Sequence, residues 1–181
     1  MKSVLISIKP KWCELIANGK KTIEVRKTRP KCDMPFKCYI YCTKDKGISF
    51  WTGKQYAYAD DRSHNLFDAC GNGKVIGEFI CNKIDRLAVC GYDNRNTELR
   101  RVDDNLKAYD LDYDYLNKCQ LSLDNLKKYS NGGGLYGWHI SDLVIYDKPK
   151  SIKEFYHYGV RRGAKITRPP QSWCYAEELK E

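Results

Sequence analysis

The chain has 181 residues, of which 42% are hydrophobic and 30% charged, and its formal net charge is +9. This length is typical of one domain with a hydrophobic core, and no apolar stretch reaches the roughly 20 residues that a membrane-spanning helix needs. The first residues are too short and too interrupted an apolar run for a secretory signal, so the sequence predicts a cytoplasmic protein without a membrane anchor.

The N-terminal part predicts a strand, a helix and two further strands. Apolar residues alternate over residues 4–8, as in a largely buried strand. Pro10 then suits the first turn of a helix, and Gly19 ends that helix because glycine accepts left-handed backbone angles. Residues 22–26 and 36–42 predict the next two strands.

The remainder of the chain is less regular. Residues 43–73 predict a long loop, and residues 74–81 an apolar strand. Apolar residues at helical spacing predict a helix over 97–109 capped by Thr97, and a second helix over 123–129. Residues 135–145 predict a strand that is interrupted near 141–142, and Pro149 is expected to close it.

This order of elements favours an α+β fold with a mixed, barrel-like sheet flanked by helices. A doubly wound nucleotide-binding fold is a weak alternative, because it would need more strand–helix units and a glycine-rich first turn. We expect one domain over residues 1–150, and a basic arm over 151–181 that packs on the same domain. The sequence does not indicate an oligomeric state.

The charge is unevenly distributed. Residues 1–31 hold nine Lys or Arg, and residues 148–168 hold seven. Between them lies an acidic segment, which contains Asp103, Asp104, Asp110, Asp112 and Asp114. If the basic ends meet, they form a surface suited to phosphate, although net charge also serves solubility.

Nine cysteines occur without any Cys-x-x-Cys pair. An odd count in a chain of this length argues against a disulfide scaffold, so we interpret them as mostly buried free thiols. A zinc site assembled from scattered Cys and His remains the alternative, and we predict no metal and no cofactor. Tyr113 and Tyr115, like other tyrosine pairs two residues apart, would share one face of a strand and are interpreted mainly as core or sheet-surface residues.

Residues 19–27 carry the most informative polar pattern. In a strand, Thr22, Glu24 and Arg26 share one face, and Lys21 lies at its start. Arg26 is suited to phosphate or a base edge, Lys21 supplies a mobile charge, and Glu24 accepts amino protons. The alternative is a solvated strand face with a Glu–Arg ion pair.

A second pattern is Trp138-His139-Ile140-Ser141. In a strand, Trp138 shares one face with Ile140, and His139 shares the other with Ser141. A histidine here is suited to binding phosphate or moving a proton, or it is a strand histidine satisfied by backbone groups.

The opening run Ser7-Ile8-Lys9-Pro10, followed by Gly19-x-Lys21-Thr22-x-Glu24-x-Arg26, resembles the signature of ASCH domains. Gly77-Glu78-Phe79 and Leu135-Tyr136-Gly137-Trp138-His139 resemble the later strands of the same family. The resemblance, which is to bacterial or prophage-type members, implies a PUA-like β-barrel with a cleft beside the first helix. It also implies RNA, a nucleotide or a modified nucleoside as ligand. We expect the ligand-binding residues to be Lys9, Lys21, Arg26, Trp138, His139 and Ser141.

One enzymatic branch of this family hydrolyses N4-acetylcytidine with a Lys, a Thr nucleophile and a Glu. Its Lys matches Lys21, but its Thr falls on Glu24, and Thr22 lies two residues earlier on the same strand face. Lys21, Glu24 and Thr22 are therefore candidate catalytic residues for RNA cleavage or nucleoside hydrolysis. We expect an RNA- or nucleotide-binding protein first, a small hydrolase second, and a protein-interaction module third.

Overall fold

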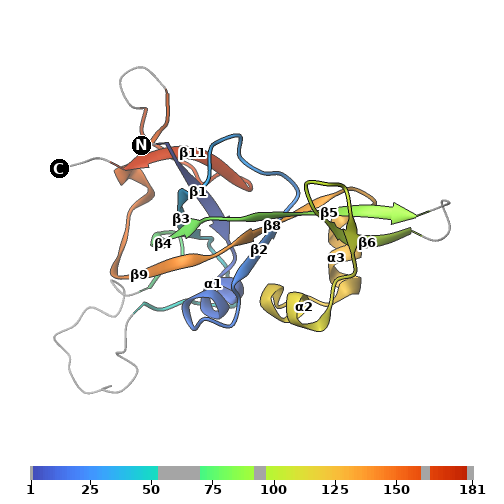
Figure 1. The fold of residues 1–181 in the computed structure, drawn as a ribbon. Helices are drawn as coiled ribbons and strands as arrows, with labels where there is room; N and C mark the ends of the chain where they lie inside the picture. Colours follow the sequence, from blue (N-terminus) through green and yellow to red (C-terminus); the bar gives the residue numbers. More distant parts are fainter. Residues whose placement is uncertain (1, 53–69, 92–96, 160–163, 179–181) are drawn as a thin grey trace. The chain divides into compact units, whose positions relative to one another are not determined.

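The computed structural model describes residues 2–52, 70–91, 97–159 and 164–178. The chain divides into two compact units, and Figure 1 shows their elements along the sequence. The first unit comprises residues 1–17, 36–80 and 142–181, and the second comprises residues 18–35 and 81–141. Tyr56, Tyr58, Arg161 and Arg162, which the sequence analysis counted among aromatic and basic residues, lie outside the described residues.

The first unit is built on a six-stranded sheet with the order β10-β11-β1-β3-β4-β9. These strands are β1 (Ser3–Ile8), β3 (Phe36–Cys42), β4 (Val75–Cys81), β9 (Ser141–Lys150), β10 (Phe155–His157) and β11 (Trp173–Glu178). The central pair β1 and β3 is parallel, with Ile6 opposite Ile40, and α1 (Pro10–Ala17) follows β1. A short 3-10 turn, η2 (Ile152–Glu154), precedes β10. Strand β11 pairs antiparallel with β1, so part of the C-terminal arm is an integral strand of this sheet.

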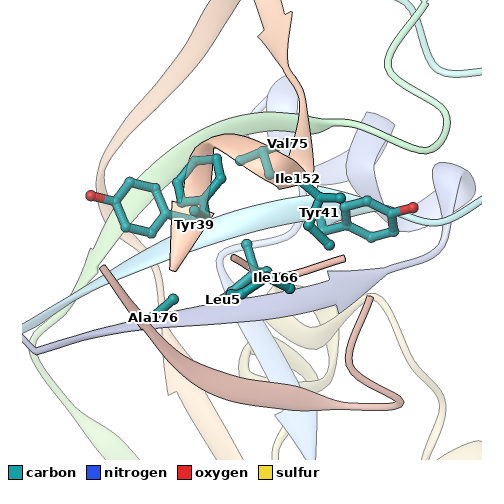
Figure 2. Close-up of a cluster of buried hydrophobic side chains, with 8 residues drawn as sticks. Leu5, Tyr39, Tyr41, Val75, Ile152, Ile166 and Ala176 are labelled. Atoms are coloured by element: carbon teal, nitrogen blue, oxygen red, sulfur yellow. The ribbon is translucent and has the colours of Figure 1, made fainter. Parts of the chain in front are cut away.

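One core of this unit lies on a single face of its sheet. Leu5 packs there with Tyr39 and Tyr41, and residues far along the chain, such as Phe155 and Ala176, complete the cluster. In Figure 2 the hydroxyl groups of Tyr39 and Tyr41 point outward at opposite ends of this cluster. The rings thus bury apolar area while their polar ends stay at the margin.

The second unit is a five-stranded sheet with the order β2-β8-β5-β6-β7 and two helices. Its elements are β2 (Ile23–Arg26), β5 (Ile84–Gly91), β6 (Thr97–Val102), β7 (Ala108–Tyr109), α2 (Tyr113–Cys119), α3 (Leu123–Ser130) and β8 (Leu135–His139). Asp112 and Ser122 cap the two helices by accepting backbone N–H groups. Gln120 and Asn131 end them in left-handed conformation.

Both helices pack on one face of this sheet. Tyr115 and Cys119 of α2 and Leu126 of α3 meet Ile23 and Leu87 in a buried cluster. The side chains that alternate with these on the strands therefore belong to the opposite face, which carries the polar residues of β2.

The structure confirms the α+β class and most of the predicted elements. It confirms the strands at 36–42 and 75–81, the helix ends at Gly19 and Asn131, and the interruption between β8 and β9. The strand pairings of the described residues form two sheets and no closed barrel, so the barrel stays a prediction. Pro149 does not close the last predicted strand, because β9 runs to Lys150.

The predicted helix over 97–109 is wrong: residues 97–102 and 108–109 form strands β6 and β7. The helical spacing was misleading because Leu106 is 73% exposed in the connecting turn, with a φ of 63°. Leu99 is buried opposite Val89, as the β5–β6 hairpin requires. Tyr113 and Tyr115 do not pair on a strand face either, since both lie in α2.

Candidate nucleic-acid interface

The three charged residues predicted around β2 form one connected cluster. Nζ of Lys21 lies 3.3 Å from Oε2 of Glu24, and Nε of Arg26 lies 3.0 Å from Oε1 of the same carboxylate. The residues are only 2%, 6% and 9% exposed, respectively. The expected solvated ion pair is therefore a buried one, in which each charge needs its partners.

The ammonium of Lys21 is fixed by backbone as well as by Glu24. It donates to the carbonyl oxygen of Ile23 at 2.9 Å and to that of Cys119 at 2.6 Å. With Glu24 these acceptors account for the three donors of an ammonium group. Lys21 thus links β2 to the end of α2 instead of supplying the mobile charge that the sequence suggested.

Thr22 is held by its backbone on both sides. Its N–H donates to the carbonyl of Lys118 at 3.0 Å, and its carbonyl accepts from the N–H of Ile140 at 2.9 Å. The residue is half-buried and lines a shallow pocket of about 520 Å³ together with Lys20 and Lys118. Thr22 therefore lines a pocket together with Lys118, at the end of α2, and Lys20, in the turn before β2.

The face of the sheet opposite the helices carries two rows of side chains that cross its strands. In one row Arg26 of β2 lies opposite Tyr136 of β8, which lies opposite Arg86 of β5. In the next row Glu24 lies opposite Trp138, which is fully buried. Opposed residues of neighbouring strands have Cβ atoms about 5 Å apart, so each row is a continuous strip of side chains.

Two pockets meet along the first row. One, of about 380 Å³, includes Lys27 and the start of β8, and the other, of about 640 Å³, includes Arg29 and Arg101. Arg86 and Tyr136 line both pockets. The guanidinium of Arg29 lies 5.9 Å from the centre of the Tyr136 ring. We call the surface formed by Lys27, Arg29, Arg86 and Tyr136 the basic groove.

His139 lies on the helix-covered face and binds a buried carboxylate. Its Nε2 is 2.6 Å from Oδ2 of Asp85, while Nζ of Lys83 is 3.1 Å from Oδ1. Burial alone would raise the pKa of Asp85, but hydrogen bonds from His139 and Lys83 outweigh it and hold the pKa below its ordinary value. The ionised carboxylate accepts from Nε2–H, which leaves Nδ1 as the second ring nitrogen for other partners.

The other predicted ligand residues, Ser141, Trp138 and Lys9, are not part of the charged cluster around β2. Ser141 is half-buried at the start of β9, and Trp138 is enclosed. Lys9 belongs to the first unit, where its side chain is exposed and its carbonyl accepts the N–H groups of Trp12 and Cys13 at the start of α1.

Sequence reasoning missed Lys27, Arg29, Arg86 and Asp85 as site residues. Arg86 and Asp85 lie in β5, a strand that the sequence pattern did not reveal, and their meeting with β8 depends on strand pairing. Tyr136 had a usable signal, since it lies two residues before Trp138 and so shares its strand face.

Among the described residues, no three His, Cys, Asp or Glu side chains are grouped so that they could hold a metal ion. The nine cysteines are free thiols, five of them buried, as the sequence interpretation held for most of them. None of the helices in the described parts of the chain has the length and apolar character needed to cross a membrane.

The ASCH domain family model matches residues 6–86. A point mutant of the ASCH protein from Zymomonas mobilis is 19% identical over 100% of this chain and 92% of its own, with a TM-score of 0.54. The Zymomonas mobilis ASCH protein itself is 17% identical over 99% of this chain and 88% of its own, with a TM-score of 0.49. No curated protein matches the sequence. The family match over residues 6–86 supports an ASCH domain in this part of the chain, and the first of these likenesses shows the shared fold.

Proposed function

We propose that this protein binds RNA or a nucleotide through the basic groove. The observation that carries the proposal is the row Arg26–Tyr136–Arg86, which places an aromatic residue between two arginines of neighbouring strands, with Tyr136 and Arg86 lining two adjoining pockets. The ASCH family is consistent with a nucleic-acid ligand. The family resemblance also leads us to expect a PUA-like barrel, and the sequence itself leads us to expect a cytoplasmic location.

The groove combines the two interactions that unpaired nucleotides need. The ring of Tyr136 offers a surface on which a base stacks, and such stacking is worth about 1–3 kcal/mol per base. Arg29, Arg86 and Lys27 offer charge-assisted hydrogen bonds to phosphate. Arg86 is exposed and Tyr136 half-buried, so both are accessible to a ligand.

Within this proposal, the residues predicted around β2 divide into two kinds. Arg26 lies opposite Tyr136 on the neighbouring strand, whereas Lys21 and Glu24 hold β2 in place. The resemblance places the ligand in a cleft beside the first helix. The groove proposed here consists of residues of the second unit alone.

The geometry favours binding over the hydrolase alternative. An acid–base pair of Lys21 and Glu24 is supported by their distance of 3.3 Å. However, both groups are buried, and the donors of Lys21 are directed at protein acceptors. A general base must reach the proton that it removes, either directly or through one water.

The test is fluorescence anisotropy of a labelled single-stranded RNA titrated with wild-type protein and with Tyr136→Ala and Arg86→Ala. We expect each variant to weaken binding about tenfold, because each removes roughly 1.4 kcal/mol of stacking or phosphate contact. Tyr136→Phe, which keeps the ring, should bind like the wild type.

Lys128→Ala is the matched control for lost charge, since Lys128 is exposed on α3 and lines neither groove pocket. Equal affinity of wild type, Tyr136→Ala and Arg86→Ala would exclude the basic groove as the binding surface. Release of product from the RNA by wild-type protein, lost in Glu24→Gln, would instead favour the hydrolase.

A further inference from the structure

One side of the larger pocket of the basic groove is lined by acidic residues. Besides Arg29 and Arg86, it is lined by Asp103, Asp104 and Leu106, which belong to the turn between β6 and β7. A surface that only attracted phosphate would gain nothing from carboxylates, because they repel it. The two charges in one pocket therefore indicate a ligand with an anionic end and a hydrogen-bond-donating end.

The turn is rigidly organised by Asp103. One oxygen of its carboxylate accepts from the N–H groups of Asn105, at 3.0 Å, and Lys107, at 2.9 Å. The other accepts from the hydroxyl of Tyr109 at 3.1 Å. These hydrogen bonds hold the pKa of Asp103 below its ordinary value, and the hydrogen bond from the Lys107 N–H has the largest effect. Asp103 is thus occupied within the protein and shapes this side of the pocket.

Asp104 differs from its neighbour. It is exposed, and its carboxylate makes no hydrogen bond or ion pair with another residue that the structure describes. Both of its oxygens are therefore available to a ligand that lies in the pocket it lines. A carboxylate with two available oxygens is suited to two parallel N–H donors.

We propose that the basic groove recognises guanine, with Asp104 accepting hydrogen bonds from the base edge while Tyr136 stacks on the ring and Arg86 binds phosphate. This inference rests on the proposed function, and it names the base that the basic groove prefers. Guanine presents the N1–H and N2–H donors side by side. Uracil and adenine each present an acceptor next to their donor, which a carboxylate repels.

The test measures the binding of GMP, IMP, AMP and UMP to the intact protein by isothermal titration calorimetry. IMP is the sharpest probe, because it differs from GMP only by the missing N2 amino group. We expect GMP to bind at least about fivefold more tightly than IMP, the lower end of the discrimination that a bidentate base contact provides.

Asp104→Asn should abolish the preference for GMP over IMP without weakening the binding of UMP. Asp110→Asn is the matched control, since Asp110 is also an exposed carboxylate, pairs with Arg100 and does not line this pocket. It should keep the preference for GMP.

The outcomes separate this inference from the function beneath it. Equal affinity for all four nucleotides, or a GMP preference that survives in Asp104→Asn, would overturn guanine recognition and leave the basic groove as a non-selective binding surface. Absence of binding for every nucleotide and for single-stranded RNA would overturn the proposed function itself.

Discussion

Nε2 of His139 lies 2.6 Å from Oδ2 of Asp85, and this contact joins the end of β8 to the start of the adjacent strand β5. Asp85 is 6% exposed, so its charge depends on His139 and Lys83 for the interactions that water would otherwise supply. Of these two residues, the sequence predicted only His139, as a candidate ligand residue. In the structure His139 and Asp85 form a pair that helps to hold the fold together.

The first prediction concerns pH. Because the pKa of Asp85 is lowered in the folded protein, its contribution to stability is complete above the unfolded value of about 4 and is lost as the pH falls through the folded value. Asp85→Asn should lower the free energy of unfolding at pH 7 by about 1.5–3 kcal/mol, the usual range for hydrogen bonds to a charged group.

Urea denaturation of both proteins between pH 7 and pH 3 measures this difference, which should shrink below pH 4. Asp124→Asn, at an exposed position in the first turn of α3, should change stability by no more than about 0.5 kcal/mol. A difference between Asp85→Asn and wild type that stays constant across this range would contradict the assignment.

The second prediction concerns Gly137, which lies against the hydroxyl group of Tyr115. A Cβ atom at position 137 would come 2.2 Å from the Tyr115 hydroxyl oxygen but 3.4 Å from Cζ. Gly137→Ala should therefore destabilise the protein by about 1–3 kcal/mol through overpacking. Tyr115→Phe removes the hydroxyl oxygen and should restore much of this loss in the double variant.

A double-mutant cycle from urea denaturation at pH 7 measures the coupling between these two positions. Additive losses in the double variant would show that the strain at position 137 comes from another contact, such as the Cγ2 atom of Ile23 at 3.1 Å.

The third prediction separates the structural role of Lys21 from a role in binding. Lys21→Met removes the donor to two carbonyls and one of the two cations beside Glu24. We expect a loss of about 3–5 kcal/mol in the free energy of unfolding, as for other broken buried ion pairs. Thermal and urea denaturation measure it.

Lys20→Met is the matched control, because Lys20 is the exposed neighbour of Lys21. It should leave stability within about 0.5 kcal/mol of the wild type. If Lys21→Met were as stable as Lys20→Met but lost RNA affinity, Lys21 would be a ligand contact and the structural role would be wrong.

The fourth prediction concerns thiol reactivity. Burial raises the pKa of Cys119 to about 12, against the opposing effect of Lys21, and burial likewise raises the pKa of Cys81 to about 12. Since the thiolate is the reactive form, both should resist iodoacetamide at pH 8 in the folded protein. Mass spectrometry of peptides after alkylation measures this.

The same peptides should be fully alkylated when the reaction is run in concentrated urea. Modification of Cys119 at equal rates in the folded and the unfolded protein would show that the α2 end opens on the timescale of the reaction.

The sequence by itself determined the local features of this protein. Alternation of apolar residues is a property of neighbouring positions, so the strands 36–42 and 75–81 were predictable. Gly19 and Asn131 end their helices because their backbones accept positive φ, which is also local. The Lys21–Glu24–Arg26 spacing likewise placed three charges around one short strand.

Only the tertiary structure decided how these elements meet. Helical and extended spacing overlap in a segment such as 97–109, and the β5–β6 pairing, which buries Leu99, resolves the choice in favour of strands. The burial of Lys21 depends on the carbonyl of Cys119, 98 residues later. The row Arg26–Tyr136–Arg86 depends on the register of three strands, and register is set by which apolar faces can be buried together.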